Sequence, residues 1–160
     1  MSIKIPANTL RLWLGVRVSG IRLLSKIIQR QERTALTLEN VSNVNKLESI
    51  KSFQSTISKS EKALAHMTQK GANTTLLKKR LKALYIGLAM LENIWNQRPH
   101  YFTLEDLAEA RNVLTGLFPS IENIYAKSKA DSPQRTLLER RIKALELAVQ
   151  AIDDLFKSRV

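Results

Sequence analysis

Cysteine is absent from this chain of 160 residues, and histidine, proline and glycine are scarce, with two, four and five copies. Without cysteine, the chain has no disulfides, no thiolate metal ligands and no thiol nucleophile. The two histidines, His66 and His100, lie far apart in the sequence, so we do not expect a histidine metal site. So few glycines and prolines cannot supply the many turns of an all-β fold.

Motifs of enzyme chemistry are also missing. The glycines are scattered, so no glycine-rich phosphate loop is present, and no Gly-x-Ser-x-Gly nucleophile motif occurs. Glu92 and Asp153 could be imagined as a carboxylate site, but helix-surface acids in local ion pairs are the simpler interpretation. We therefore expect a protein that is not an enzyme and that needs no cofactor or metal.

Long apolar runs are missing as well. The longest early stretch, residues 10–28, is interrupted by Arg11, Arg17, Arg22 and Lys26, which argues against a transmembrane helix and a secretory signal. Residues 1–31 contain no acid, several arginines and serines and one threonine, a composition typical of mitochondrial transit peptides. We expect a cytoplasmic location, with a mitochondrial or membrane-peripheral one as the alternative.

Apolar residues recur at helical spacing through nearly the whole chain, so the sequence predicts an all-α fold. The expected helices cover about 8–33, 38–70, 75–97, 104–129 and 134–160. Gly71 is typical of the position just after a helix end, and Thr103 with two following acids is typical of a helix start. Pro119 is expected to kink or break the fourth helix. The apolar side of the helix at 38–70 is expected to comprise Val41, Val44, Leu47, Ile50, Phe53, Ile57, Leu64 and Met67.

The sequence also repeats itself with an offset of 61 residues. Residues 75–84 (TLLKKRLKAL) match residues 136–145 (TLLERRIKAL), and the register continues to Trp95 and Phe156. We expect a tandem duplicated helical hairpin, 38–97 and 103–160, that forms a four-helix bundle preceded by a basic amphipathic N-terminal helix. This divides the chain into residues 1–35 and a bundle at 36–160.

The duplication predicts two equivalent ion pairs across the hairpins. Glu61 aligns with Glu122, and Arg80 aligns with Arg141. We expect the pairs Glu61–Arg80 and Glu122–Arg141, with Lys82 and Lys143 as competing partners. Exposed pairs of this kind contribute only about 0–1 kcal/mol, so they would fix the register of the helices more than the stability.

Positive charge is placed unevenly along the chain. The whole chain has 26 lysines and arginines against 14 acids, a net charge of +12. Residues 1–35 carry +6 and residues 41–101 carry +7, whereas residues 102–160 are neutral. A one-sided field of this kind attracts polyanions such as nucleic acid, acidic lipid or an acidic protein.

The N-terminal helix is basic on one side and apolar on the rest. At about 100° per residue, Arg11, Arg22, Lys26, Arg30 and Arg33 fall within an arc of about 100°. The apolar residues cover roughly 200°, whereas a surface helix needs a stripe only somewhat wider than about 100°. The bundle, a second chain or a membrane interface could cover this broad apolar surface.

A second basic cluster, Lys78, Lys79, Arg80 and Lys82, lies at the start of the helix over 75–97. Lys78, Lys79 and Lys82 face away from the apolar stripe of that helix, and Tyr85 projects near Lys82. Lysines beside an exposed aromatic ring could hold a phosphate and stack on a base. The alternative interpretation is a solvated, charged helix face.

These observations predict a non-enzymatic binding protein that docks on nucleic acid, either DNA or RNA, through the N-terminal helix and the first hairpin. Phosphate contacts would dominate, and no groove or base readout is predicted. One alternative is a helical adaptor or structural subunit that buries its N-terminal helix in a protein partner or oligomer. A further alternative is peripheral association with an anionic membrane.

Overall fold

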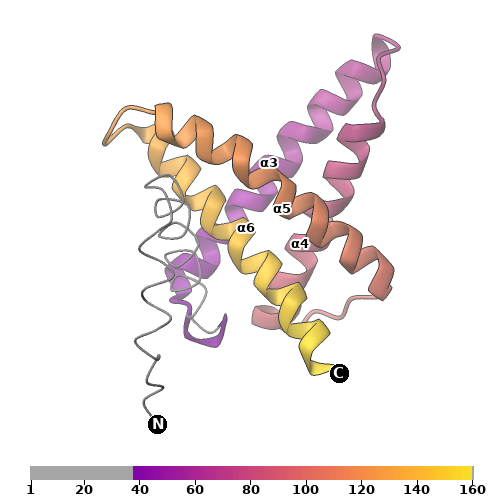
Figure 1. The fold of residues 1–160 in the computed structure, drawn as a ribbon, viewed down its shortest axis with the longest axis vertical. Coiled ribbons are helices and arrows are strands. Elements are labelled where there is room, and N and C mark those ends of the chain that lie inside the picture. Colours follow the sequence, from indigo (N-terminus) through magenta and orange to yellow (C-terminus); the bar gives the residue numbers. More distant parts are fainter. Residues whose placement is uncertain (1–37, 160) are drawn as a thin grey trace, which may run out of the picture. The chain divides into compact units, whose positions relative to one another are not determined.

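The computed structural model describes residues 38–159, which lie in one compact unit, Thr37–Val160 (Figure 1). A short 3-10 helix, η1 (Leu38–Asn40), precedes four long α-helices: α3 (Asn43–Gln69), α4 (Thr75–Asn96), α5 (Leu104–Lys127) and α6 (Pro133–Ser158). No strand occurs among these residues, so the all-α prediction is confirmed for them. The expected helix over 8–33, with Arg11, Arg22, Lys26, Arg30 and Arg33, lies outside the described residues.

Three of the four helix starts are fixed by side-chain caps. Ser42 accepts the backbone N–H of Asn45 at 3.2 Å, and Thr103 forms a complete capping box with Asp106. Ser132 caps α6, whose first residue is Pro133, where the missing N–H costs nothing. These caps satisfy backbone donors that have no partner within the helix.

The end of α3 is closed by Gly71, as the sequence predicts. Its φ of +66° is left-handed, and its N–H donates to the carbonyl of Thr68 at 3.1 Å. The next N–H, of Ala72, reaches the carbonyl of Met67 at 3.0 Å, which completes a Schellman motif. The chain therefore turns within a few residues into α4, and the two helices pack as a hairpin.

The beginning of α3 differs from the prediction. The α-helix starts at Asn43 and not at Leu38, because Ser42 takes the cap position. Val44 and Leu47, expected on the apolar side, are 67% and 54% exposed. The face that packs against the other helices instead carries Ser49, Phe53 and Ile57, at a spacing of four residues. Val44 and Leu47 lie outside this face.

Pro119 lies inside α5 and does not break it. A proline in a helix interior costs about 3 kcal/mol through a lost hydrogen bond and a steric clash. The helix nevertheless runs on to Lys127, because side chains on both sides of the proline pack on the core. Leu114 and Phe118 are buried before it, and Ile121 packs on the core after it.

The four helices pack against each other as a helical bundle. Helices α3 and α5 each pack on both α4 and α6, and α4 and α6 pack on each other. In Figure 1 the α3–α4 hairpin crosses the α5–α6 hairpin, and the connecting end of each extends beyond the crossing. The core lies where the helices meet; its largest fully buried side chains are Phe53, Ile86, Met90, Leu91, Leu107, Leu114 and Ile152.

One hydrogen bond ties the segment before α3 to the end of α4. The indole N–H of Trp95 donates to the carbonyl of Leu38 at 3.2 Å, and Leu38 itself is buried. Within residues 38–159, no helix is long and apolar enough to cross a membrane.

Candidate polyanion interface

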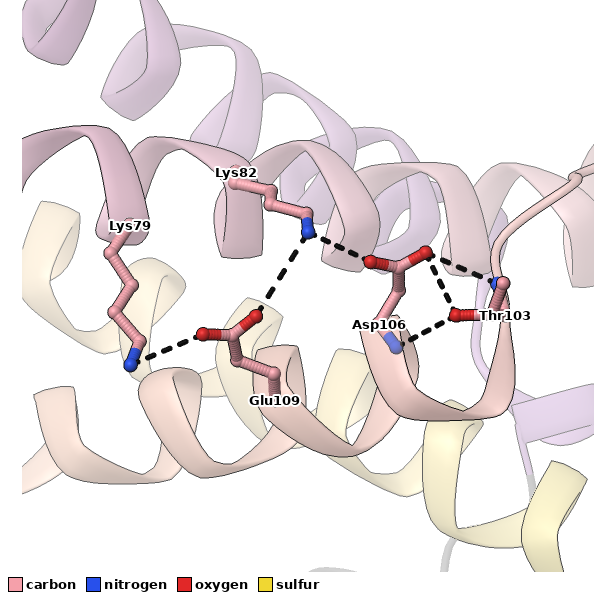
Figure 2. A network of polar contacts seen from close by, with 5 residues as sticks. All are labelled: Lys79, Lys82, Thr103, Asp106 and Glu109. Carbon is pink, nitrogen blue, oxygen red and sulfur yellow. Dashed lines mark hydrogen bonds and ion pairs between the residues drawn. The ribbon is translucent and has the colours of Figure 1, made fainter.

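The lysine cluster predicted at the start of α4 is largely occupied by acids of the same chain (Figure 2). Nζ of Lys82 lies 2.7 Å from Oδ1 of Asp106 and 3.9 Å from Oε2 of Glu109. Nζ of Lys79 lies 3.1 Å from the other oxygen of Glu109. Both acids belong to α5, so these ion pairs join the two hairpins.

Asp106 is central to this network because it serves two functions. One carboxylate oxygen accepts from Lys82, and the other accepts from the backbone N–H and the hydroxyl of Thr103. The hydrogen bond from Lys82, followed by those from Thr103, lowers the pKa of Asp106. In return, the hydrogen bond to Asp106 and its negative charge raise the pKa of Lys82. The lysine is therefore already charge-compensated in the absence of any ligand.

Tyr85 is engaged on the neighbouring helix α3. Its hydroxyl donates a hydrogen bond to the carboxylate of Glu61, which raises the pKa of Tyr85. Lys82 therefore reaches toward α5 and Tyr85 toward α3. The two side chains do not form the joint phosphate and base site that the sequence suggested.

The expected ion pairs across the hairpins are not formed. Glu61 accepts a hydrogen bond from Tyr85 and forms no ion pair with Arg80, and Lys82 pairs with Asp106. Neither Arg80 nor Arg141 forms an ion pair with any residue in the range 38–159.

Of the predicted cluster, Lys78 and Arg80 remain exposed and without an ion pair among the described residues. The sequence could not reveal this, because the neutralising acids come from a helix about 25 residues further along the chain. Of the three lysines predicted to contact a polyanion from α4, only Lys78 forms no ion pair within residues 38–159.

A different row of free cations runs along α3. Lys51, Lys59, Lys62 and Lys70 are all exposed and form no ion pair within the part of the chain that the structure describes. At about 100° per residue they fall within an arc of about 100°, and they extend over roughly 28 Å of helix. We call these four residues the α3 lysine row.

No acid interrupts the α3 lysine row. Glu61 lies on another face of α3, and Glu48 precedes the row and pairs with Arg140 of α6 at 2.9 Å. The sequence analysis missed the row. The four lysines follow one another at intervals of eight, three and eight residues, which keeps them within about 100° of one helix face.

The two acids considered as a carboxylate site, Glu92 and Asp153, are also paired. Glu92 contacts Arg98 at 3.3 Å, and Asp153 receives two hydrogen bonds from Arg111. Glu92 and Asp153 thus pair with two different arginines. Within residues 38–159, no group of three histidine or acidic side chains is placed to hold a metal ion.

Comparison of the chain with protein-family models, with curated proteins and with solved structures finds no match. Any functional proposal must therefore come from the residues and their geometry.

Proposed function

We propose that this protein is a non-enzymatic binding protein that docks a polyanion, in the first instance the phosphate backbone of nucleic acid. The observation that carries the proposal is the α3 lysine row. Its four cations share one exposed helix face, and no acid of the described chain neutralises them. Lys78, in the first turn of α4, adds a further free cation beyond the loop that follows Lys70.

The contacts available determine the kind of binding expected. Lysine is a point charge that binds phosphate without reading bases. Four phosphate contacts give a log–log salt slope of about −3.6 on duplex DNA, at about −0.9 per contact. The basic residues predicted for the N-terminal helix, Arg11, Arg22, Lys26, Arg30 and Arg33, would make this slope steeper. Binding that is indifferent to sequence and weakened by salt is the expected result.

A matched pair of variants tests this proposal. Lys51, Lys59, Lys62 and Lys70 are changed to glutamine in one variant. In the control, four lysines of the second hairpin are changed to glutamine: Lys127, Lys129, Lys143 and Lys157. Both variants lower the net charge by the same amount. Binding to duplex DNA, RNA and heparin is then measured at several salt concentrations.

We expect the α3 variant to lose at least tenfold in affinity at low salt and to lower the salt slope by about 3 to 4. The control variant should bind within about threefold of the parent, since its cations lie outside the row. Equal losses in both variants, or no binding by the parent protein at low salt, would overturn the proposal.

A helical adaptor remains the second candidate, because large apolar side chains are exposed at the beginning of α3. Val44 and Leu47 lie one turn apart and face no other described helix. A partner chain could cover them. Light scattering of the parent and of a Val44→Ser, Leu47→Ser variant tests this candidate: loss of an oligomer in the variant supports it, and a monomeric parent argues against self-assembly.

We also propose that the bundle arose by duplication of one helical hairpin. Helices α3 and α5 begin 61 residues apart, each after a hydroxyl cap, Ser42 or Thr103. Exchanging the two hairpins leaves the pattern of helix contacts unchanged. Leu84 and Leu145, also 61 residues apart, are equally buried. Replacing either leucine by alanine should therefore destabilise the protein by a similar amount. If the two losses of unfolding free energy differ by more than about 2 kcal/mol, the two leucines do not have equivalent surroundings.

A further inference from the structure

All four helices line a groove that the proposed function does not use. It has a volume of about 260 Å³, and its lining includes two charged residues, Arg80 of α4 and Arg141 of α6, and no acid. Neither arginine forms an ion pair within residues 38–159. Two guanidinium groups thus line one groove without a counter-charge from the described chain.

The rest of the groove is apolar on the side of α5. Leu117 and Ile121 are half-buried there, and Ile124 is 46% exposed, although it is a large aliphatic side chain. These three residues are spaced by four and three positions, so they form a ridge along one helix face. Within residues 38–159, Ile124 leaves part of this ridge exposed to solvent, at a cost that an apolar partner would remove.

The side of the groove formed by α3 is small and polar. Ser52, Thr56 and Ser60 line it at intervals of one turn. The hydroxyl of Thr56 donates to the carbonyl of Ser52 at 2.8 Å, and that of Ser60 donates to the carbonyl of Thr56 at 2.9 Å. Because these two donors are used within α3, the hydroxyl oxygens of Thr56 and Ser60 can only accept hydrogen bonds. The short side chains also allow another backbone to approach closely.

We propose that this groove binds an amphipathic acidic helix of a protein partner, whose carboxylates pair with Arg80 and Arg141. The groove follows α3 over eight residues, about 12 Å, which corresponds to roughly two turns of a docked helix. An apolar face on that helix would cover Leu117, Ile121 and Ile124, as in other helix-in-groove complexes. Flanking carboxylates would supply the missing negative charge, and arginine favours such pairs because its guanidinium binds carboxylate bidentately.

The chemistry distinguishes this partner from nucleic acid. A phosphate backbone could satisfy the two arginines, but it would leave the aliphatic ridge uncovered. The groove is also displaced around α3 from the lysine row: by the helical period, Ser52 lies at the edge of that row, and Thr56 and Ser60 are turned away from its centre by about 90° and about 130°. The two surfaces can therefore be tested independently.

The test is a selection on the full-length protein. The library displays helical peptides of 16 residues with a fixed leucine and isoleucine face, and with flanking positions randomised among Glu, Lys, Gln and Ser. We expect the selected peptides to be enriched in glutamate. Their affinity should fall at least tenfold in an Arg80→Glu, Arg141→Glu variant, and lysine-rich peptides should bind that variant better than the parent. An Ile124→Glu variant should weaken the same peptides while both arginines remain.

The matched control is Lys127→Glu with Lys129→Glu, which changes the net charge equally outside the groove and should leave peptide affinity within about twofold. Thermal unfolding is measured for each variant to check that it is folded. Selection of basic or neutral peptides, or binding that does not respond to the arginine variant, would overturn the proposal. It would also be overturned if no peptide is selected and the arginine variant loses affinity only for heparin or for phosphatidylglycerol vesicles. Loss of nucleic-acid binding in the α3 lysine variant would not affect it.

Discussion

Arg111 of α5 holds the carboxylate of Asp153 of α6 with two parallel hydrogen bonds, from Nε to Oδ1 and from Nη2 to Oδ2, the latter at 3.1 Å. The two residues are 42 positions apart in the sequence, and both side chains are partly exposed. The hydrogen bond from Arg111 to Asp153 raises the pKa of the guanidinium further. This bidentate pair fixes the register of the second hairpin.

A double-mutant cycle on Arg111→Ala and Asp153→Ala should give a coupling of about 1 kcal/mol in the free energy of urea unfolding. Bidentate geometry favours a value at the upper end of the range for exposed pairs, and solvent exposure limits it. The comparison is Arg98–Glu92, a single contact in which the arginine side chain is 67% exposed. Its cycle should give less than about 0.5 kcal/mol. Equal coupling energies in the two cycles would contradict the conclusion that the bidentate pair is the stronger of the two.

Gly87 of α4 lies directly against the core. A Cβ atom there would stand 2.9 Å from Cε1 of Phe53 and 3.2 Å from Cδ1 of Leu114, and both neighbours are buried. Gly87→Ala should therefore destabilise the protein by about 1–3 kcal/mol through overpacking, although alanine favours helices.

Gly116 of α5 is the matched control for Gly87, because nothing lies within 4 Å of the position its Cβ would take. Gly116→Ala should stabilise the protein by up to about 1 kcal/mol through helix propensity alone. Opposite signs in thermal or urea unfolding are the expected result. A stabilising Gly87→Ala substitution would show that the ring of Phe53 can move aside.

Gly71 tests the backbone at the α3–α4 turn. Its φ of +66° is unfavourable for residues with a Cβ, but no atom crowds the position. Gly71→Ala should destabilise the protein by about 1 kcal/mol, and Gly71→Asn by less, since asparagine tolerates the left-handed conformation better. Both are measured by urea unfolding. Equal costs for the two variants would rule out backbone strain as the cause.

The Lys82–Asp106 bridge predicts a pH dependence. The pKa of Asp106 is lower in the folded protein, so the pair stabilises the fold above the unfolded aspartate pKa of about 3.9. That stabilisation is lost as the pH falls through the lower folded value. The melting temperature of Asp106→Asn should therefore be below that of the parent at pH 7, and the gap should narrow below about pH 4. A gap that is constant with pH would contradict the bridge.

The local features of the fold could be predicted from the sequence. Helical spacing, the cap at Thr103 and the glycine at position 71 all act within a few residues, and the structure confirms them. Two expectations were wrong, a helix break at Pro119 and an apolar contact for Val44, because packing determines both. Core contacts around Phe118 outweigh the local cost of the proline, and no neighbouring helix covers Val44.

The candidate sites were harder to predict, because a charge becomes free or paired only through its neighbours in space. In the sequence, Lys79 and Lys82 form a basic cluster with no acid beside it. In the folded protein, Asp106 and Glu109 of α5 pair with these two lysines. Arg80 was expected to pair with Glu61 and instead lines a groove together with Arg141. The α3 lysine row, in contrast, could have been recognised from the sequence, since three of its residues belong to one helix and Lys70 is the C-cap of that helix.

The sequence by itself determined the helical class, the main helix ends and the excess of positive charge, because these depend on neighbouring residues and on composition. Only the tertiary structure decided which cations are neutralised and which face solvent. Ion pairing and burial require side chains to meet within a few ångströms, and residues distant in the sequence meet in this way only after the hairpins pack.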